Sequence, residues 1–133
     1  MSIQISVLLI DDSEFYRELY ADELPRKKNL KVQKASSARE GLDLATQSPN
    51  EFARFVINDR MEGEQVGVWF ANQLIERGIY MKGFILTAHP ENITRPLPEN
   101  VLGLLEKPKT PYQLYVEIHD DFVPELQPVL SAR

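Results

Sequence analysis

Five polar residues stand where short apolar runs of this chain end, and their types together suit phosphoryl chemistry. Three are acids, and the other two are a hydroxyl and an ammonium: Asp11, Asp12, Asp59, Thr87 and Lys107. Carboxylates on one rim repel one another unless a cation is present, and oxygen donors without His or Cys suit a hard divalent ion such as Mg²⁺. A carboxylate can also attack a phosphoryl group, while an ammonium and a hydroxyl stabilise the transferred anion. These residue types therefore predict a site at which one Asp accepts a phosphoryl group.

The elements that must position these residues alternate between buried strands and amphipathic helices. Short apolar runs predict strands over Ser6 to Ile10, Lys31 to Ala35, Phe55 to Asn58, Gly83 to Leu86 and Val101 to Leu105. Apolar residues at helical spacing predict helices over Ser13 to Leu24, Ala38 to Thr46, Val66 to Arg77 and Tyr112 to Phe122. Because parallel strands need crossover connections, this alternation predicts an α/β fold with a doubly wound parallel sheet. Ligands of such sheets bind at the carboxyl ends of the strands, where the five polar residues stand.

The connection between the fourth and fifth strands departs from this regular alternation. It contains three prolines, Pro90, Pro96 and Pro98. Proline interrupts helices, so only a turn or two around residues 91–95 is expected to be helical.

Composition limits the class of protein. The chain has 133 residues, which is the size of one domain, and 15 Lys+Arg against 20 Asp+Glu give a net charge of −5. An acidic chain is a poor match for phosphate backbones of nucleic acids. The absence of Cys excludes disulfides and thiolate chemistry. No segment approaches the length of a membrane span, and the N-terminus lacks the pattern of a signal peptide, so a cytoplasmic location is expected.

In four places the sequence resembles the receiver domain of two-component response regulators. Val7 to Asp12 (VLLIDD) is similar to the acidic strand end of that family, and Phe55 to Asp59 (FVIND), with Gly67 eight residues on, is similar to its phosphoacceptor strand. Leu86 to Ala88 resembles its switch strand, and Glu106 to Pro108 resembles its lysine–proline strand end. The resemblance covers nearly the whole chain. It implies a flavodoxin-like, five-stranded parallel sheet of order 2-1-3-4-5 with helices on both faces.

The resemblance also implies a role for each site residue. Asp59 would be the phosphoacceptor. Thr87 would bind a phosphoryl oxygen and move when the group arrives, and Lys107 would pair with the same group. The implied ligands of Mg²⁺ are Asp12 and Asp59 directly, Asp11 through water, and the backbone carbonyl of Met61.

As a member of this family, the chain is expected to be a stand-alone signalling module and no enzyme. Residues 1–123 would form the receiver domain, and residues 124–133 a short tail without an output domain. The expected partners are a histidine kinase or phosphotransfer protein and a downstream target protein, with no nucleic acid and no membrane. The chain would be a monomer or a phosphorylation-dependent dimer.

Three departures from the family pattern keep an alternative open. The family usually has Met-Pro where this chain has Glu62 and Gly63, and an aromatic residue where it has Leu104. The proline-rich fourth connection belongs to the face that receivers use for output. These features permit a receiver-like binding module that does not depend on phosphorylation, although all five site residues argue against it.

Two classes of enzyme fit the sequence less well. A haloacid-dehalogenase-like phosphatase has Asp-x-Asp after its first strand, whereas this chain has adjacent Asp11 and Asp12, and no length remains for a cap insertion. A P-loop nucleotidase is disfavoured because the chain has no G-x-x-x-x-G-K-[ST], and a dinucleotide-binding domain is disfavoured because no glycine-rich turn follows the first strand.

Overall fold

Five parallel strands form one sheet at the centre of the molecule. A computed structural model describes residues 5–24, 30–61, 63–107 and 109–118. The expected boundary at residue 123, the tail 124–133 and Glu62 lie outside these residues. The strands are β1 (Ile5–Ile10), β2 (Leu30–Ala35), β3 (Arg54–Asn58), β6 (Lys82–Thr87) and β7 (Val101–Glu106). Their order, β2-β1-β3-β6-β7, confirms the predicted order 2-1-3-4-5, because β6 and β7 are the fourth and fifth strands of this sheet.

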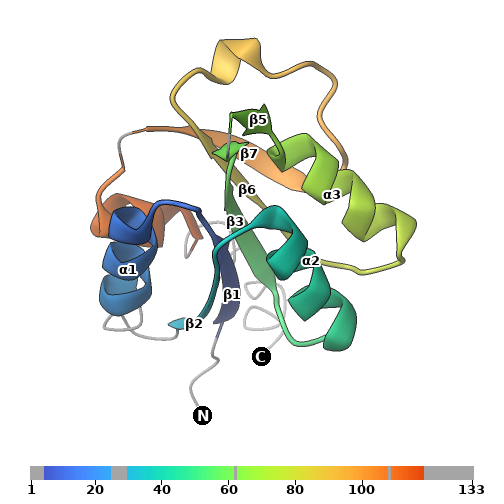
Figure 1. Cartoon of the computed structure of the whole chain (residues 1–133), viewed down its shortest axis with the longest axis horizontal. Helices are drawn as coiled ribbons and strands as arrows, with labels where there is room; N and C mark the ends of the chain where they lie inside the picture. The colour runs from blue at the N-terminus through green and yellow to red at the C-terminus, as the bar shows by residue number, and fades with distance from the viewer. Residues whose placement is uncertain (1–4, 25–29, 62, 108, 119–133) are drawn as a thin grey trace, which may run out of the picture.

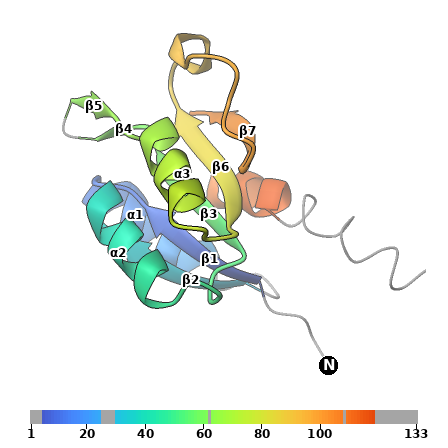
Figure 2. The same cartoon turned by 90° about the vertical axis from the view of Figure 1, so that its right-hand side faces the viewer.

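Helices cover both faces of the sheet. Helix α1 (Glu14–Glu23) and the helix over residues 111–118 lie on one face, and α2 (Ala38–Gln47) and α3 (Gly67–Glu76) lie on the other (Figures 1 and 2). Helices on both faces of a parallel sheet confirm the predicted doubly wound fold.

None of the helices in the described part of the chain has the length and apolar character needed to span a bilayer.

Alternating residues of the strands build the two cores. In β1, Leu8 and Ile10 pack in the core beneath α2 and α3, while Val7 and Leu9 pack in the core beneath α1. Every one of these four side chains is 0–1% exposed. Because both faces are covered, the strand reads as a continuous apolar run rather than as an alternating pattern.

Serine side chains cap the starts of two of the helices. The Ser13 hydroxyl accepts a hydrogen bond from the Tyr16 amide at 3.4 Å, and the Ser37 hydroxyl accepts one from the Glu40 amide at 3.0 Å. Gly78 follows α3 with a φ of 69°, the left-handed conformation in which glycine commonly ends a helix. The cap at Ser13 fixes the chain directly after Asp11 and Asp12.

The connection between β6 and β7 is irregular. Its helical part is the single 3₁₀ turn η2 (Pro90–Asn92), slightly earlier than the predicted residues 91–95. Figure 1 shows this connection looping out beyond the carboxyl ends of the strands. The prediction of a short, irregular fourth helix is confirmed.

A small hairpin after β3 was absent from the prediction. Strands β4 (Arg60–Met61) and β5 (Glu64–Gln65) pair in antiparallel fashion, and Gly63 between them has a φ of 81°. Two-residue strands carry too few residues to show a period in the sequence. The hairpin lies between Asp59 and α3, so it forms one wall of the predicted site.

Gly83 in β6 is the glycine whose replacement tests the packing of the sheet. A Cβ atom at this position would lie 2.1 Å from the backbone oxygen of Phe55 on β3. We expect Gly83→Ala to lower the free energy of unfolding by about 2 kcal/mol or more, because the backbones of β3 and β6 would have to move apart to admit the methyl group. Gly103→Ala on β7 is the matched control, since its Cβ would meet nothing nearer than 3.8 Å. Urea unfolding measures both, and equal losses in the two variants would contradict this close approach of β3 to β6.

Candidate functional site

The carboxyl edge of the sheet gathers the residues predicted to do chemistry. Asp11 and Asp12 follow β1, Asp59 follows β3, Thr87 ends β6 and Lys107 follows β7. All these strands are parallel, so their carboxyl ends meet at one edge. The placement predicted from the sequence is therefore observed, while the role of each residue stays a prediction.

One cavity brings three of these residues together. Asp59, Thr87 and Lys107 line a cavity of about 470 Å³, together with Asn58 and His89. The irregular β6–β7 connection contributes part of the cavity wall. A small anion bound in this cavity would lie near the Asp59 carboxylate, the Thr87 hydroxyl and the Lys107 ammonium.

Asp59 is held firmly by the residues around it. Its amide donates to the Leu86 carbonyl at 2.8 Å, and its carbonyl accepts from the Val66 amide at 2.7 Å. The residue is 3% exposed, and its carboxylate Oδ1 accepts from the Gly67 amide at 3.2 Å. A side chain at Gly67 would meet that same oxygen at 3.0 Å and Ile85 at 2.8 Å, which explains why glycine stands there.

Asp11 lies deeper than Asp59 and is 1% exposed. Its Oδ1 accepts from the Ser13 amide at 2.9 Å and from Nδ2 of Asn58 at 3.4 Å. Its carbonyl accepts from the Arg17 guanidinium at 3.0 Å. Asp11 therefore joins the start of α1 to the end of β3.

Burial dominates the electrostatics of both acids. It raises the pKa of Asp11 and the pKa of Asp59 above the ordinary value of 3.8, because the charged form loses hydration. The amides of Ser13 and Gly67 and the ammonium of Lys107 oppose this effect on the pKa, but only in part. A further cation at this edge would stabilise the ionised forms.

Lys107 points to an amide rather than to an acid. Its Nζ donates to Oδ1 of Asn58 and lies 5.7 Å from the centroid of the Tyr16 ring. Its backbone amide donates to the Thr87 carbonyl at 2.9 Å. Among the described residues no ion pair joins Lys107 to Asp59, although the charge of Lys107 acts on the pKa of both buried acids.

The Thr87 hydroxyl connects the site to the β6–β7 connection. Thr87 is only 7% exposed, and its Oγ1 accepts a hydrogen bond from the His89 amide at 3.1 Å. A hydroxyl that accepts one hydrogen bond still has its own proton to donate. Thr87 can therefore donate to an anion in the cavity while it is tied to the chain that follows.

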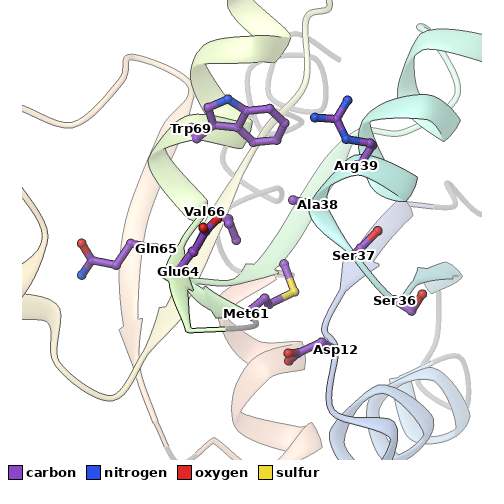
Figure 3. Close-up of a pocket in the computed structure, with 10 residues that line it drawn as sticks. All are labelled: Asp12, Ser36, Ser37, Ala38, Arg39, Met61, Glu64, Gln65, Val66 and Trp69. Atoms are coloured by element: carbon purple, nitrogen blue, oxygen red, sulfur yellow. The ribbon is translucent and has the colours of Figure 1, made fainter.

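Asp12 lies in a neighbouring cavity. This second cavity, of about 450 Å³, has Asp12 and Met61 at one end and Arg39 and Trp69 at the other (Figure 3). The Arg39 guanidinium carbon lies 5.9 Å from the centroid of the Trp69 ring. Trp69 also lines a smaller cavity with Asp59, so its fluorescence is a suitable probe of this edge of the sheet.

The predicted metal ligands fit Mg²⁺ by their chemistry, although they do not form a ready-made cluster. Asp11, Asp12, Asp59 and the Met61 carbonyl offer only oxygen, which Mg²⁺ prefers, and Mg²⁺ usually takes a few protein ligands with several waters. Within the segments that the structure describes, no three acidic or histidine side chains are grouped closely enough to hold a metal ion. Two buried acids with raised pKa values nevertheless make a place where a divalent cation is favourable.

Comparison with known proteins gives matches of structure alone. No protein-family model matches the chain, and a search of curated proteins finds no match. A response regulator receiver domain protein from Clostridium thermocellum superposes with a TM-score of 0.76 at 23% identity, over 91% of this chain and 96% of that one. The receiver domain of the putative regulator NarL from Mycobacterium tuberculosis gives 0.76 at 20% identity, over 89% and 95%. Chemotaxis protein CheY4 from Vibrio cholerae gives 0.67 at 21% identity, over 88% and 98%.

This chain has the receiver fold. The resemblance predicted from four sequence motifs is thereby confirmed at the level of structure.

The sequence prediction missed Asn58. This residue is 7% exposed, and its amide contacts Asp11, Lys107 and the carbonyl of Arg60, the last at 3.0 Å. A polar residue that ends the apolar run of β3, directly before Asp59, was the signal that could have found it. Its position directly before Asp59 and its contacts with Asp11 and Lys107 make it part of the candidate site.

The raised pKa of Asp11 predicts how stability depends on pH. The folded chain keeps the Asp11 proton to a higher pH than the unfolded chain, so stability falls as pH rises through the window above 3.8. Without metal, we expect Asp11→Asn to raise the free energy of unfolding at pH 7 by on the order of 1 kcal/mol. The Asn oxygen can still accept from the Ser13 amide.

Urea unfolding in a chelating buffer at several pH values measures this effect. The gain should shrink as the pH approaches 3.8, because the wild-type carboxyl is then protonated as well. A variant less stable than the wild type at pH 7 would show that Asp11 is not destabilising when ionised.

Proposed function

We propose that this chain is a response regulator receiver that accepts a phosphoryl group on Asp59. The donor would be the phosphohistidine of a histidine kinase or phosphotransfer protein. The observation that carries this proposal is the shared cavity, in which a buried, anchored Asp59 lies with Thr87 and Lys107. The receiver fold of the compared structures supports it.

The anchoring of Asp59 suggests which of its atoms reacts. Among the described residues, Oδ1 is the carboxylate oxygen that accepts a hydrogen bond, and it comes from Gly67. That bond fixes the carboxylate plane and makes Oδ2 the candidate nucleophile. In the transfer, the P–N bond of phosphohistidine breaks, a P–O bond to Oδ2 forms, and the imidazole keeps the electron pair and takes up a proton.

The other residues of the site would stabilise the transferred group. The ammonium of Lys107 offsets its negative charge, and the Thr87 hydroxyl donates to one of its oxygens. Mg²⁺ bound by Asp11, Asp12, Asp59 and the Met61 carbonyl would supply further charge neutralisation. The receiver would act once per phosphorylation and turn over no external substrate.

Output would pass through the connection between β6 and β7. The bond between Thr87 and the His89 amide ties the hydroxyl to this segment, which includes η2. A phosphoryl group that recruits the Thr87 hydroxyl would therefore shift the balance between conformations of the segment. A downstream protein that contacts this surface would read the change.

A binding module independent of phosphorylation is the second candidate. It is favoured by one observation, the hydrogen bond of Lys107 to Asn58 instead of an ion pair with Asp59. In that case the buried site would have a purely structural role. Phosphorylation of the purified protein distinguishes the two functions.

Phosphorylation with a small donor tests the proposed function. Incubation with phosphoramidate and Mg²⁺ should add one phosphoryl group per chain, measured by intact mass. Asp59→Asn should abolish the addition because the amide is not a nucleophile, and a chelator should suppress it in the wild type. Asp43→Asn, on the surface helix α2, is the control and should label as the wild type does. Full labelling of the Asp59→Asn variant at one site would refute the assignment.

The lifetime of the phosphoryl group is a separate prediction. Met61, two residues after Asp59, is 4% exposed and packs in the core, so its thioether cannot orient an attacking water by hydrogen bonding. We expect slow self-hydrolysis, over minutes or longer, measured as the loss of the added mass after the donor is removed. Loss of the group within seconds would contradict this expectation.

A further inference from the structure

One amide side chain joins the lysine of the site to its deepest acid. Asn58 Oδ1 accepts from Nζ of Lys107, and Asn58 Nδ2 donates to Oδ1 of Asp11 at 3.4 Å and to the Arg60 carbonyl at 3.0 Å. These contacts use the donor and the acceptor side of the amide at once, which fixes its orientation. The chain from Lys107 through Asn58 to Asp11 is called the amide bridge below.

We propose that Asn58 is a positioning residue that holds Lys107 away from Asp59 until an anion arrives there. This inference rests on the proposed function and adds a step to it. When a phosphoryl group forms on Asp59, the ammonium of Lys107 moves from the Asn58 oxygen to the phosphoryl oxygens. The amide bridge therefore opposes this move, and the phosphoryl group must compete with Asn58 for the ammonium of Lys107.

Because Asn58 is buried, loss of its hydrogen bond with Lys107 destabilises the state with bound anion. The residue is 7% exposed, so an Oδ1 atom that loses Lys107 has little access to water. A buried acceptor left without a donor is unfavourable, and the state with bound anion bears that penalty. Removing the acceptor should therefore favour the anion-bound state.

The surroundings of Lys107 leave it room to exchange partners. Its side chain is partly exposed, and the same cavity is lined by Lys107, Asn58 and Asp59. Its contact with the Tyr16 ring at 5.7 Å restrains the ammonium only weakly, because such contacts are not directional like hydrogen bonds. Lys107 can thus turn from Asn58 toward Asp59 within one enclosure.

Two substitutions of Asn58 separate a positioning role from a structural one. Asn58→Ala removes the acceptor and frees Lys107, whereas Asn58→Asp has almost the same shape and holds Lys107 by an ion pair. The probe is beryllofluoride, a phosphoryl mimic, at saturating Mg²⁺, and its binding is followed by Trp69 fluorescence. We expect Asn58→Ala to tighten beryllofluoride binding about three- to tenfold and Asn58→Asp to weaken it about tenfold or more.

The position of the ammonium supplies a readout that a structural role would not change. In protein with ¹⁵N-labelled lysine side chains, the Nζ signal missing from a Lys107→Met spectrum belongs to Lys107. Without any anion, this signal should differ between the wild type and Asn58→Ala. On addition of beryllofluoride it should shift in the wild type and stay in place in Asn58→Asp.

A second buried amide provides the matched control. Asn100 is 8% exposed, donates to the Ala71 carbonyl at 3.0 Å, and precedes β7 at the opposite end of the sheet. Asn100→Ala should leave beryllofluoride affinity unchanged even if it lowers stability. Asn58→Ser takes the place of Asn58→Ala if the alanine variant does not fold.

The outcomes distinguish this inference from the proposed function. If the wild type binds no beryllofluoride with Mg²⁺, the proposed function fails, and the inference fails with it. If the wild type binds it but both Asn58 variants weaken binding, Asn58 is a structural residue and the inference alone fails. The inference is also overturned if, in the absence of anion, the Nζ signal of Lys107 is the same in Asn58→Ala as in the wild type.

Discussion

The burial of two carboxylates at one edge of the sheet is the constraint on which this structure depends. Asp11 and Asp59 are 1% and 3% exposed, and burial raises both of their pKa values. The surrounding elements offset this cost with the N–H groups of Ser13 and Gly67 at the starts of α1 and α3, and with the charge of Lys107. The offset is incomplete, so the site is stabilised by whatever further cation it can recruit. A site built in this way is sensitive to any change of charge within it.

The fold makes this burial possible because an apolar core lies on each face of the sheet, behind its carboxyl edge. Side chains of the strands fill both faces of the sheet up to the carboxyl edge, where the chain must turn. Asp59 occurs at such a turn, and its backbone is bonded to Leu86 on the next strand and to Val66 before α3. The stability lost by burying acids at the edge is thus supplied by apolar packing elsewhere, as is usual for functional sites.

Residue types at strand ends allowed most of the site to be predicted, because a parallel sheet brings those ends together whatever the details of packing. The strand order also followed from the resemblance and was confirmed. Side-chain partners could not be predicted in this way. The hydrogen bond of Lys107 to Asn58 is one example, since the partners available to a flexible side chain are defined only by the folded cavity. The hairpin of β4 and β5 was missed because strands of two residues leave no period in the sequence. The cavity that Trp69 and Asp59 line together forms only when α3 packs beside the end of β3.

The irregular β6–β7 connection bears on how such a site could signal. A helix at this place would move as a rigid body, because its backbone hydrogen bonds are internal and its packed face is large. Here the helical part is the single turn η2, and Thr87 reaches the segment through one hydrogen bond to the His89 amide. Segments with few internal hydrogen bonds change conformation at low cost, so a small displacement of the Thr87 hydroxyl can alter many of their residues. If Asp59 is phosphorylated as proposed, the readout is therefore a redistribution among conformations of the β6–β7 connection. A partner that binds one of these conformations stabilises it further and completes the shift in population.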